Sequence, residues 1–301
     1  MTSVTLTDGG MGQELVRRSK SEPTPLWSAR VLIDEPDLVR DLHAEFIRAG
    51  ARVITINTYS ATPERLAREG ADDLFKPLQK RGIELARQAR DESGDAAIAG
   101  CLSPLFGSYA PALTISFEET LDTYRRIVAE QVDGVDLFLC ETMASADEAR
   151  AAVTAATESG KPVWVSWTLA DHGMPRLRSG ETIAAASAAL GDLPVAARLL
   201  NCCRPEAIAA ALPELIALGG PVGAYANGFT SVEALKHGGT VEVLHARHDL
   251  DPDAYADHAI GWVEAGAGIV GGCCEVGPAH IAALRDRLIQ AGHQLSGVSY
   301  A

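Results

Sequence analysis

The chain has 301 residues, with 26 Lys or Arg against 40 Asp or Glu, so its formal net charge is −14. It contains no basic block, which excludes the electrostatic footprint of a nucleic-acid or anionic-membrane binder. Residues 1–7 lack a secretory signal pattern, and the longest uncharged window, 96–117, is broken by Pro and Gly, so we expect no membrane span. Six cysteines without a signal peptide favour reduced thiols in the cytoplasm.

Short apolar runs alternate with helical patterns along the chain. The strand-like runs are residues 4–7, 53–59, 96–101, 136–140, 162–168, 195–201, 221–226 and 267–270. The helical patterns are 36–49, two stretches through 92, then 117–131, 145–158, 181–190, 205–218, 252–265 and 278–291. Eight apolar runs, each followed by a helix, predict an α/β fold, a single closed (β/α)8 TIM barrel. An open doubly wound sheet is the alternative.

The barrel is expected to be one domain. A barrel of this type takes roughly 250 residues, and the chain has no internal repeat, low-complexity tract or linker that would divide residues 1–301. The connection 228–251 is longer than most loops in compact domains, which indicates a lid or binding loop.

Polar and thiol side chains collect where the predicted strands end. These are Asp8 with Gly9 and Gly10, Asn57, Cys101, Glu141, Asn201 with Cys202, Asn227, and Cys273 with Cys274. Active sites of this fold lie at the carboxyl ends of the strands. We therefore expect these residues to meet at one mouth of the barrel.

Two adjacent cysteine pairs stand out. Neighbouring cysteines do not readily form a disulfide with each other, but Cys273 and Cys274 can both turn toward one soft metal ion. Within Cys202-Cys203 only one residue can face the barrel axis if strand alternation persists. Cys202 directly follows the strand, so we expect it as the third ligand and Cys203 as a bystander. Three thiolates would form a zinc site with an open fourth position.

Several of these residues also have structural interpretations. Cys101 and Cys140 lie inside apolar strands and are expected to be buried as small apolar side chains. Asp8 could cap the following segment, and Glu141 could be a carboxylate favoured at a helix start. The histidines form no ligand pattern, so we expect surface or packing roles for them.

The motifs together resemble a known family. The segments are DGGMGQEL (8–15), PLWSARVLI (25–33), NTYSATPERL (57–66), ETM (141–143), NCC (201–203) and GGCCEVGPAHIAALR (271–285). Over nearly the whole chain they resemble the zinc-dependent homocysteine S-methyltransferases. The resemblance implies a (β/α)8 barrel in which Cys202, Cys273 and Cys274 are the catalytic zinc ligands and homocysteine is methylated to methionine.

The resemblance also implies homocysteine contacts. They fall on Asp8, the backbone of Gly9 and Gly10, Thr55 or Asn57 in the second strand, and Glu141. Asn227 matches the asparagine of the family's seventh-strand motif, although Ala226 stands where the family usually has proline.

The chemistry of a three-thiolate site supports this interpretation independently. Homocysteine's thiol has a reference pKa near 8.5, and zinc coordination deprotonates a thiol. A zinc site that activates water more often uses histidines, so thiolate ligation favours thiol activation over hydrolysis. The substrate ammonium needs a carboxylate, for which Glu141 and Asp8 qualify. Its carboxylate needs the N–H groups that a Gly-Gly turn presents.

The methyl donor is expected to be a small molecule. A chain of 301 residues has no room for folate or cobalamin domains, which favours S-methylmethionine or S-adenosylmethionine. Trp164, Trp167, Tyr109 and Phe229 are candidates for a wall around the donor cation. A betaine or folate donor, another thiol or selenol acceptor on the same zinc, and a non-catalytic zinc-binding or redox-sensing barrel are the alternatives. The oligomeric state is left open.

Overall fold

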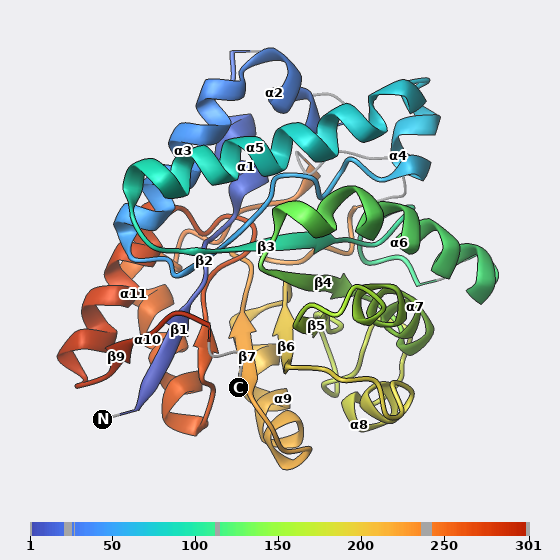
Figure 1. The fold of residues 1–301 in the computed structure, drawn as a ribbon. Helices are drawn as coiled ribbons and strands as arrows, with labels where there is room; N and C mark the ends of the chain where they lie inside the picture. The colour runs from blue at the N-terminus through green and yellow to red at the C-terminus, as the bar shows by residue number, and fades with distance from the viewer. Residues whose placement is uncertain (1, 21–25, 27, 112–114, 236–242, 299–301) are drawn as a thin grey trace.

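The computed structural model describes residues 2–20, 26, 28–111, 115–235 and 243–298. Its strands form one curled parallel sheet in the order β2-β3-β4-β5-β6-β7-β8-β1-β9 (Figure 1). They are β1 (Ser3–Leu6), β2 (Val53–Thr55), β3 (Ala97–Leu102), β4 (Leu137–Met143), β5 (Val163–Trp167), β6 (Ala197–Asn201), β7 (Val222–Tyr225), β8 (Ile269–Val270) and β9 (Gln294–Leu295).

The sheet closes on itself between β1 and β2. Thr7 forms a parallel bridge with Val53, and the Arg52 amide donates to the Leu6 carbonyl over 2.7 Å. Because β8 pairs with the other side of β1, the eight strands complete a barrel. The predicted α/β barrel is therefore confirmed, and the open doubly wound sheet is wrong.

Helices surround the barrel (Figure 1). They are α1 (Met11–Arg18), α2 (Ser28–Asp34), α3 (Pro36–Ala49), α4 (Pro63–Arg68), α5 (Phe75–Ser93), α6 (Phe117–Gln131), α7 (Ala146–Thr157), α8 (Ile183–Ala188), α9 (Pro205–Ala217), α10 (Pro252–Ala265) and α11 (Pro278–Gln290), with short 3-10 turns η1 (Asp72–Leu74) and η2 (Val132–Gly134). Proline occupies the first turn of α3, α4, α9, α10 and α11, where its missing N–H costs nothing. No helix among the described residues is long and apolar enough to cross a bilayer.

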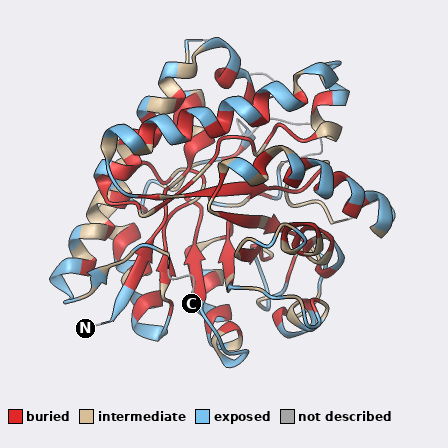
Figure 2. Ribbon diagram, viewed as in Figure 1, coloured by how far each residue is buried: buried red, intermediate tan, exposed pale blue. Residues whose placement is uncertain are grey.

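Two apolar layers fill the structure, and the strands separate them. Figure 2 shows buried strands and helices that are buried on the inward face and exposed outside. The inner layer, made of alternate strand residues inside the barrel, consists of Val53, Ala99, Leu137, Leu139, Trp164, Ala197, Leu199, Tyr225 and Ile269. The residues between them on each strand pack outward against the helices. The inner layer fills the barrel below the carboxyl ends of the strands.

Some elements differ from the sequence prediction. The helices α1 and α2 and the strand β9 were not predicted, because α1 buries few apolar residues and the other two are short. The second strand was expected to reach residue 59 but ends at Thr55. Beyond it the Thr58 amide donates to the Ile56 carbonyl, and the Asn57 side chain donates to the Ser28 carbonyl. These bonds replace the strand ladder with a turn.

Candidate active site

A pocket of about 140 Å³ opens at the carboxyl ends of the strands. This volume is far larger than the roughly 10–15 Å³ that one water needs, so the pocket has room for a small molecule as well as an ion. Nine of the ten predicted site residues line it, namely Asp8, Gly9, Gly10, Thr55, Asn57, Glu141, Cys202, Cys273 and Cys274. Asn227 is the exception. It is buried, and its Nδ2 has no hydrogen-bond partner among the described residues.

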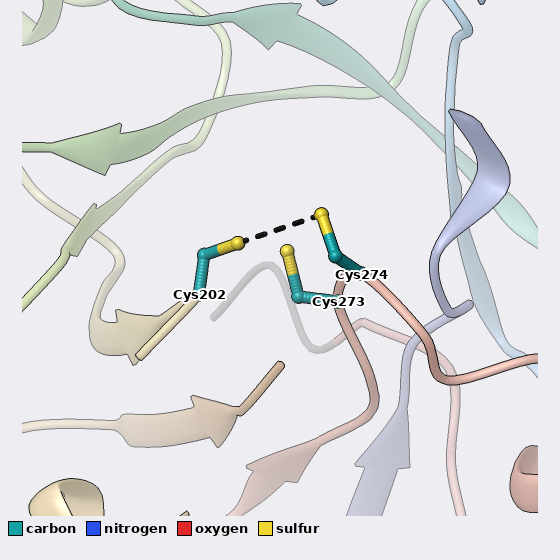
Figure 3. Close-up of side chains that lie close together, drawn as sticks. All are labelled: Cys202, Cys273 and Cys274. Atoms are coloured by element: carbon teal, nitrogen blue, oxygen red, sulfur yellow. Dashed lines mark hydrogen bonds between the residues drawn. The ribbon is translucent and has the colours of Figure 1, made fainter. Parts of the chain in front are cut away.

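Three cysteine sulfurs converge in this pocket. The Sγ atoms of Cys202, Cys273 and Cys274 all lie within 4.8 Å of one another. Those of Cys202 and Cys274 are 3.8 Å apart. Figure 3 shows all three side chains pointing toward a common point from the ends of β6 and β8. The group can hold a metal ion.

The direction of Cys202 depends on its backbone. Leu199 belongs to the inner layer and Leu200 to the outer core, so simple alternation would direct Cys202 outward and Cys203 inward. The structure shows the reverse, because Cys202 has φ of 49° and turns the chain. Its sulfur therefore enters the pocket while Cys203 is fully buried in the outer core.

A glycine-lined turn fixes Cys273 and Cys274. A Cβ on Gly9 would overlap the Val276 carbonyl, and a Cβ on Gly10 would lie 2.5 Å from the Cys273 carbonyl. The Gly10 amide donates to the Val276 carbonyl over 2.8 Å. The end of β1 thus packs directly on the turn that carries the two cysteines, and only glycine leaves the necessary room.

Two carboxyl groups lie beside the sulfurs. Burial raises the pKa of Asp8 well above its ordinary value, and the nearby charge of Glu141 raises it further. The Thr55 amide donates to Asp8 Oδ2 over 2.8 Å, and this hydrogen bond lowers the pKa. Burial also raises the pKa of Glu141 to about 7, opposed by the Cys101 thiol, which donates to Glu141 Oε1 over 3.1 Å. An ammonium group entering the pocket would favour ionisation of both.

Cys101 and Cys140 are both buried, as expected from their strands. Burial, and then the nearby charge of Glu141, raise the pKa of each thiol well above its ordinary value, so neither ionises at neutral pH. Cys101 has an additional function that its position in an apolar strand did not indicate, since its thiol orients Glu141.

Tyr109 was considered only as a possible wall residue, yet it contacts a metal-ligand candidate. Its hydroxyl lies 2.9 Å from Cys202 Sγ. The Arg178 guanidinium lies 4.7 Å from the centre of the Tyr109 ring, and Arg178 pairs with buried Asp171 over 2.9 Å. Asp171 also accepts from the amide of Val232 over 2.7 Å. This chain of contacts joins the connections after β3, β5 and β7 around Cys202.

The other predicted wall residues divide between the pocket and the core. Trp164 lines the pocket from the inner layer, whereas Trp167 is in the outer core. Phe229 is buried against Cys202 but does not line the pocket. Within the predicted binding loop 228–251, residues 236–242 lie outside the described residues, as do Pro25 and Trp27 of the PLWSARVLI motif.

Backbone strain gathers at the same place. Among the described residues, the non-glycine residues with positive φ are Tyr109, Thr142, Cys202 and Glu275, with φ between 49° and 66°. The first three line the pocket and the fourth follows Cys274. The Asn201 side chain stabilises Thr142 by accepting from its amide over 2.9 Å and donating to its hydroxyl over 2.8 Å. Such concentrated strain is a mark of a functional site.

Comparisons with known proteins show the family to which this chain belongs. The family described as homocysteine S-methyltransferase matches residues 5–288. Homocysteine S-methyltransferase from Escherichia coli (strain K12) is 33% identical over 303 residues, which cover 94% of this chain and 95% of the relative. The chain belongs to the homocysteine S-methyltransferase family. It is therefore an enzyme that methylates homocysteine, as the sequence motifs predicted.

A solved structure and a second relative are also similar to this chain. The crystal structure of homocysteine methyltransferase MmuM from Escherichia coli, in its metallated form, superposes with a TM-score of 0.79 at 32% identity, covering 95% of this chain and 96% of that one. Selenocysteine methyltransferase from Astragalus bisulcatus is 30% identical, covering 90% of this chain and 88% of the relative.

Proposed function

We propose that this homocysteine S-methyltransferase uses a sulfonium donor, S-methylmethionine or S-adenosylmethionine, and a zinc ion held by Cys202, Cys273 and Cys274. The convergence of the three sulfurs carries the proposal. In a tetrahedral site with Zn–S bonds of about 2.3 Å, the ligand sulfurs lie about 3.8 Å apart. Cys202 and Cys274 have this separation, and a set of thiols suits zinc.

When bound, zinc would lower the pKa of the homocysteine thiol, whose reference value is near 8.5. The protein's own groups would orient the amino acid. Glu141 and Asp8 would receive its ammonium group. The Gly9 amide, which has no partner among the described residues, would receive its carboxylate, whereas the Gly10 amide already bonds Val276. Thr55 would act by holding Asp8.

The remaining two predicted contacts differ in position. Asn57 lines the pocket at the end of β2, so we assign it to the homocysteine side. Asn227 does not line the pocket, and its Oδ1 accepts from the Phe229 amide over 3.1 Å. We assign it to supporting the chain after β7, behind the sulfurs.

The transfer itself balances without a general acid. Homocysteine's thiol proton leaves to the solvent before the transfer, and its sulfur attacks the methyl carbon of the sulfonium. The old carbon–sulfur bond breaks with its electron pair, which returns the donor sulfur to a neutral thioether. The new bond makes methionine. The chain's role in this step is to hold both sulfurs in line with the methyl group.

The test is a zinc assay on protein purified under reducing conditions, followed by turnover with homocysteine and each of S-methylmethionine, S-adenosylmethionine, betaine and a methylfolate. About one zinc per chain and methionine from a sulfonium donor would support the proposal. Turnover with betaine or methylfolate alone would overturn the donor assignment. Full turnover in metal-free protein would overturn the zinc assignment.

A selenol acceptor is a second candidate, favoured by the likeness to a selenocysteine methyltransferase. A selenol is more acidic than a thiol and would occupy the same position beside the sulfurs. Competition between homocysteine and a selenol amino acid in one reaction measures the ratio of their kcat/KM values. A ratio above one for the selenol would make it the preferred acceptor.

We further assign residues 1–301 to one homocysteine-binding barrel domain, which the family match over residues 5–288 supports. We assign the enzyme to the cytoplasm because its six described cysteines are free and the three in the pocket must stay reduced to bind a metal. Limited proteolysis tests the first assignment, because a single domain would give no stable fragment smaller than the barrel.

A further inference from the structure

The pocket has two arginines that the homocysteine site does not use. Arg65 and Arg68 both line it, and both come from α4. Thr62 caps this helix, and its hydroxyl accepts from the Arg65 amide over 3.3 Å. Residues three apart lie on one face of a helix, so the two guanidinium groups approach the pocket from the same side. Two cations in one pocket are notable in a chain whose net charge is −14.

Arg65 is held in position by contacts other than a salt bridge, and its charge acts on the pKa of buried Glu148 against the effect of burial. Its Nη2 donates to the Pro104 carbonyl over 2.9 Å, and its guanidinium carbon lies 5.2 Å from the centre of the Tyr59 ring. Its Nε is buried and has no hydrogen-bond partner in the part of the chain that the structure describes. No ion pair among the described residues includes Arg65. The neighbouring Glu64 accepts from Thr123 instead. A buried donor without a partner is costly, so an acceptor from a ligand would stabilise Arg65.

Arg68 adds a second positive charge nearby. Partial burial and then the charge of Arg65 lower its pKa, with Glu69 acting in the opposite direction. An anion bound near both guanidinium groups would be attracted by both charges. Arginine suits a carboxylate particularly well because its planar fork can donate two parallel hydrogen bonds.

The lining of the pocket therefore includes groups of both charges. Asp8, Glu141 and the three-cysteine group are acidic, and the two arginines are cations. Tyr59, Phe106 and Tyr109 also line the pocket. Aromatic rings attract cations, and Tyr59 lies directly beside Arg65. Tyr109, in contrast, lies beside Cys202, so aromatic rings lie near both the arginines and the sulfurs.

We propose that Arg65 and Arg68 form an anion subsite for the carboxylate of an amino-acid sulfonium donor, while the methyl-bearing sulfur of that donor faces the three cysteines. This subsite rests on the proposed function, because it needs a donor that carries both charges. The acceptor's carboxylate is assigned to the Gly9 amide, so the arginines serve the donor. S-Methylmethionine and S-adenosylmethionine both have the required pair of charges.

The experiment compares two donors that differ by one group. They are S-methylmethionine and (3-aminopropyl)dimethylsulfonium, which is S-methylmethionine without its carboxylate. We would measure kcat/KM for each donor in the zinc-loaded enzyme and, independently of turnover, the Kd of each by calorimetry. The variants are Arg68→Ala and Arg65→Lys, the second of which keeps the charge and removes the fork. Arg81→Ala is the matched control, because Arg81 lies on α5 outside the pocket and pairs with Glu84.

We expect the wild-type protein to prefer S-methylmethionine in both measurements. Each pocket variant should weaken its binding and kcat/KM about tenfold to a hundredfold, as for loss of a charged hydrogen bond. Values for the donor without a carboxylate should change less than about threefold. Arg81→Ala should match wild type for both donors.

The results distinguish a failure of the arginine subsite from a failure of the proposed function. If the wild-type enzyme makes methionine from both donors equally well and binds them equally, the subsite is wrong while the proposed function stands. If it turns over neither donor, the proposed function is wrong, and calorimetry still decides whether the arginines bind the carboxylate. If the variants raise KM for homocysteine and not for the donor, the arginines serve the acceptor, which also overturns the inference.

Discussion

The two adjacent cysteine pairs look alike in sequence but differ in structure. Cys273 and Cys274, after β8, direct both sulfurs into the pocket. Cys202 and Cys203, after β6, diverge, so that one sulfur joins the metal-ligand group and the other enters the outer core. The backbone makes the difference. A glycine-packed turn holds the first pair, whereas the left-handed φ of Cys202 separates the second. Which cysteine sulfurs enter the pocket is thus decided by local backbone conformation and not by residue type.

The largest loss of zinc and activity should come from removing one of the two cysteines after β8. Cys273→Ala removes one of three thiolates, so bound zinc should fall from about one per chain to a small fraction. Methionine formation should fall at least about a thousandfold, more than the 10–100-fold typical when a residue behind a ligand is lost. Metal analysis and turnover on the same sample measure both, and circular dichroism should show an intact fold. A variant that keeps full activity without zinc would contradict the metal assignment.

The role of the turn that carries Cys273 and Cys274 can be tested by a substitution that leaves all three cysteines in place. In Gly10→Ala the added Cβ meets the Cys273 carbonyl, so the turn must move. We expect a loss of about 1–3 kcal/mol in unfolding free energy, as for other overpacked sites, and about a tenfold to hundredfold weaker zinc affinity. Denaturant titration and chelator competition measure these quantities.

Gly261→Ala is the control for that change. Gly261 lies in α10 with open space around its missing Cβ, so alanine should leave zinc affinity unchanged and stabilise the helix by up to about 1 kcal/mol. Equal zinc affinities for Gly10→Ala and Gly261→Ala would show that the turn does not set the positions of the sulfurs.

The ionisation of Glu141 should make homocysteine binding depend on pH. Its pKa of about 7, raised by burial first and also by Cys202, leaves it largely neutral below pH 7. Homocysteine's ammonium needs the carboxylate, so KM for homocysteine should rise about tenfold per pH unit below the pKa. Glu141→Gln should raise KM at pH 8 about tenfold and remove this dependence. Thiol deprotonation affects both proteins, so the ratio of their KM values isolates Glu141. A ratio that is constant from pH 6 to 8 would exclude the carboxylate from substrate binding.

The smallest catalytic effect should come from replacing Cys203, whose sulfur lies in the outer core. Cys203→Ala removes a fully buried side chain from the outer core, and the loss in unfolding free energy should be about 1–2 kcal/mol. Zinc content and kcat/KM should stay within about twofold of wild type. A loss of zinc comparable to that in Cys273→Ala would mean that the two members of the β6 pair are equivalent after all.

Much of this architecture was accessible from the sequence because each strand is a continuous apolar run followed by an amphipathic helix. The sulfur group followed from the same pattern, since thiols at strand ends must meet at one mouth of a barrel. The contacts of Tyr109, Arg65 and Cys101 did not follow. Each depends on how a connection folds over the mouth or which way a side chain turns, and periodicity carries no signal for either. The alternation rule even predicts the wrong direction for Cys202, where a left-handed residue overrides it.

Barrel closure also has a consequence for the order of assembly. The Gly9-Gly10 segment that packs on the cysteine turn lies at the start of the chain, while Cys273 and Cys274 lie close to its end. Contacts between such distant residues form late, because closing a long loop costs entropy before the contacts repay it. A nascent chain therefore cannot complete the three-sulfur group until the turn after β8 has been synthesised. Metal uptake would then mark the finished barrel, and the ion would link the end of β6 to the turn after β8.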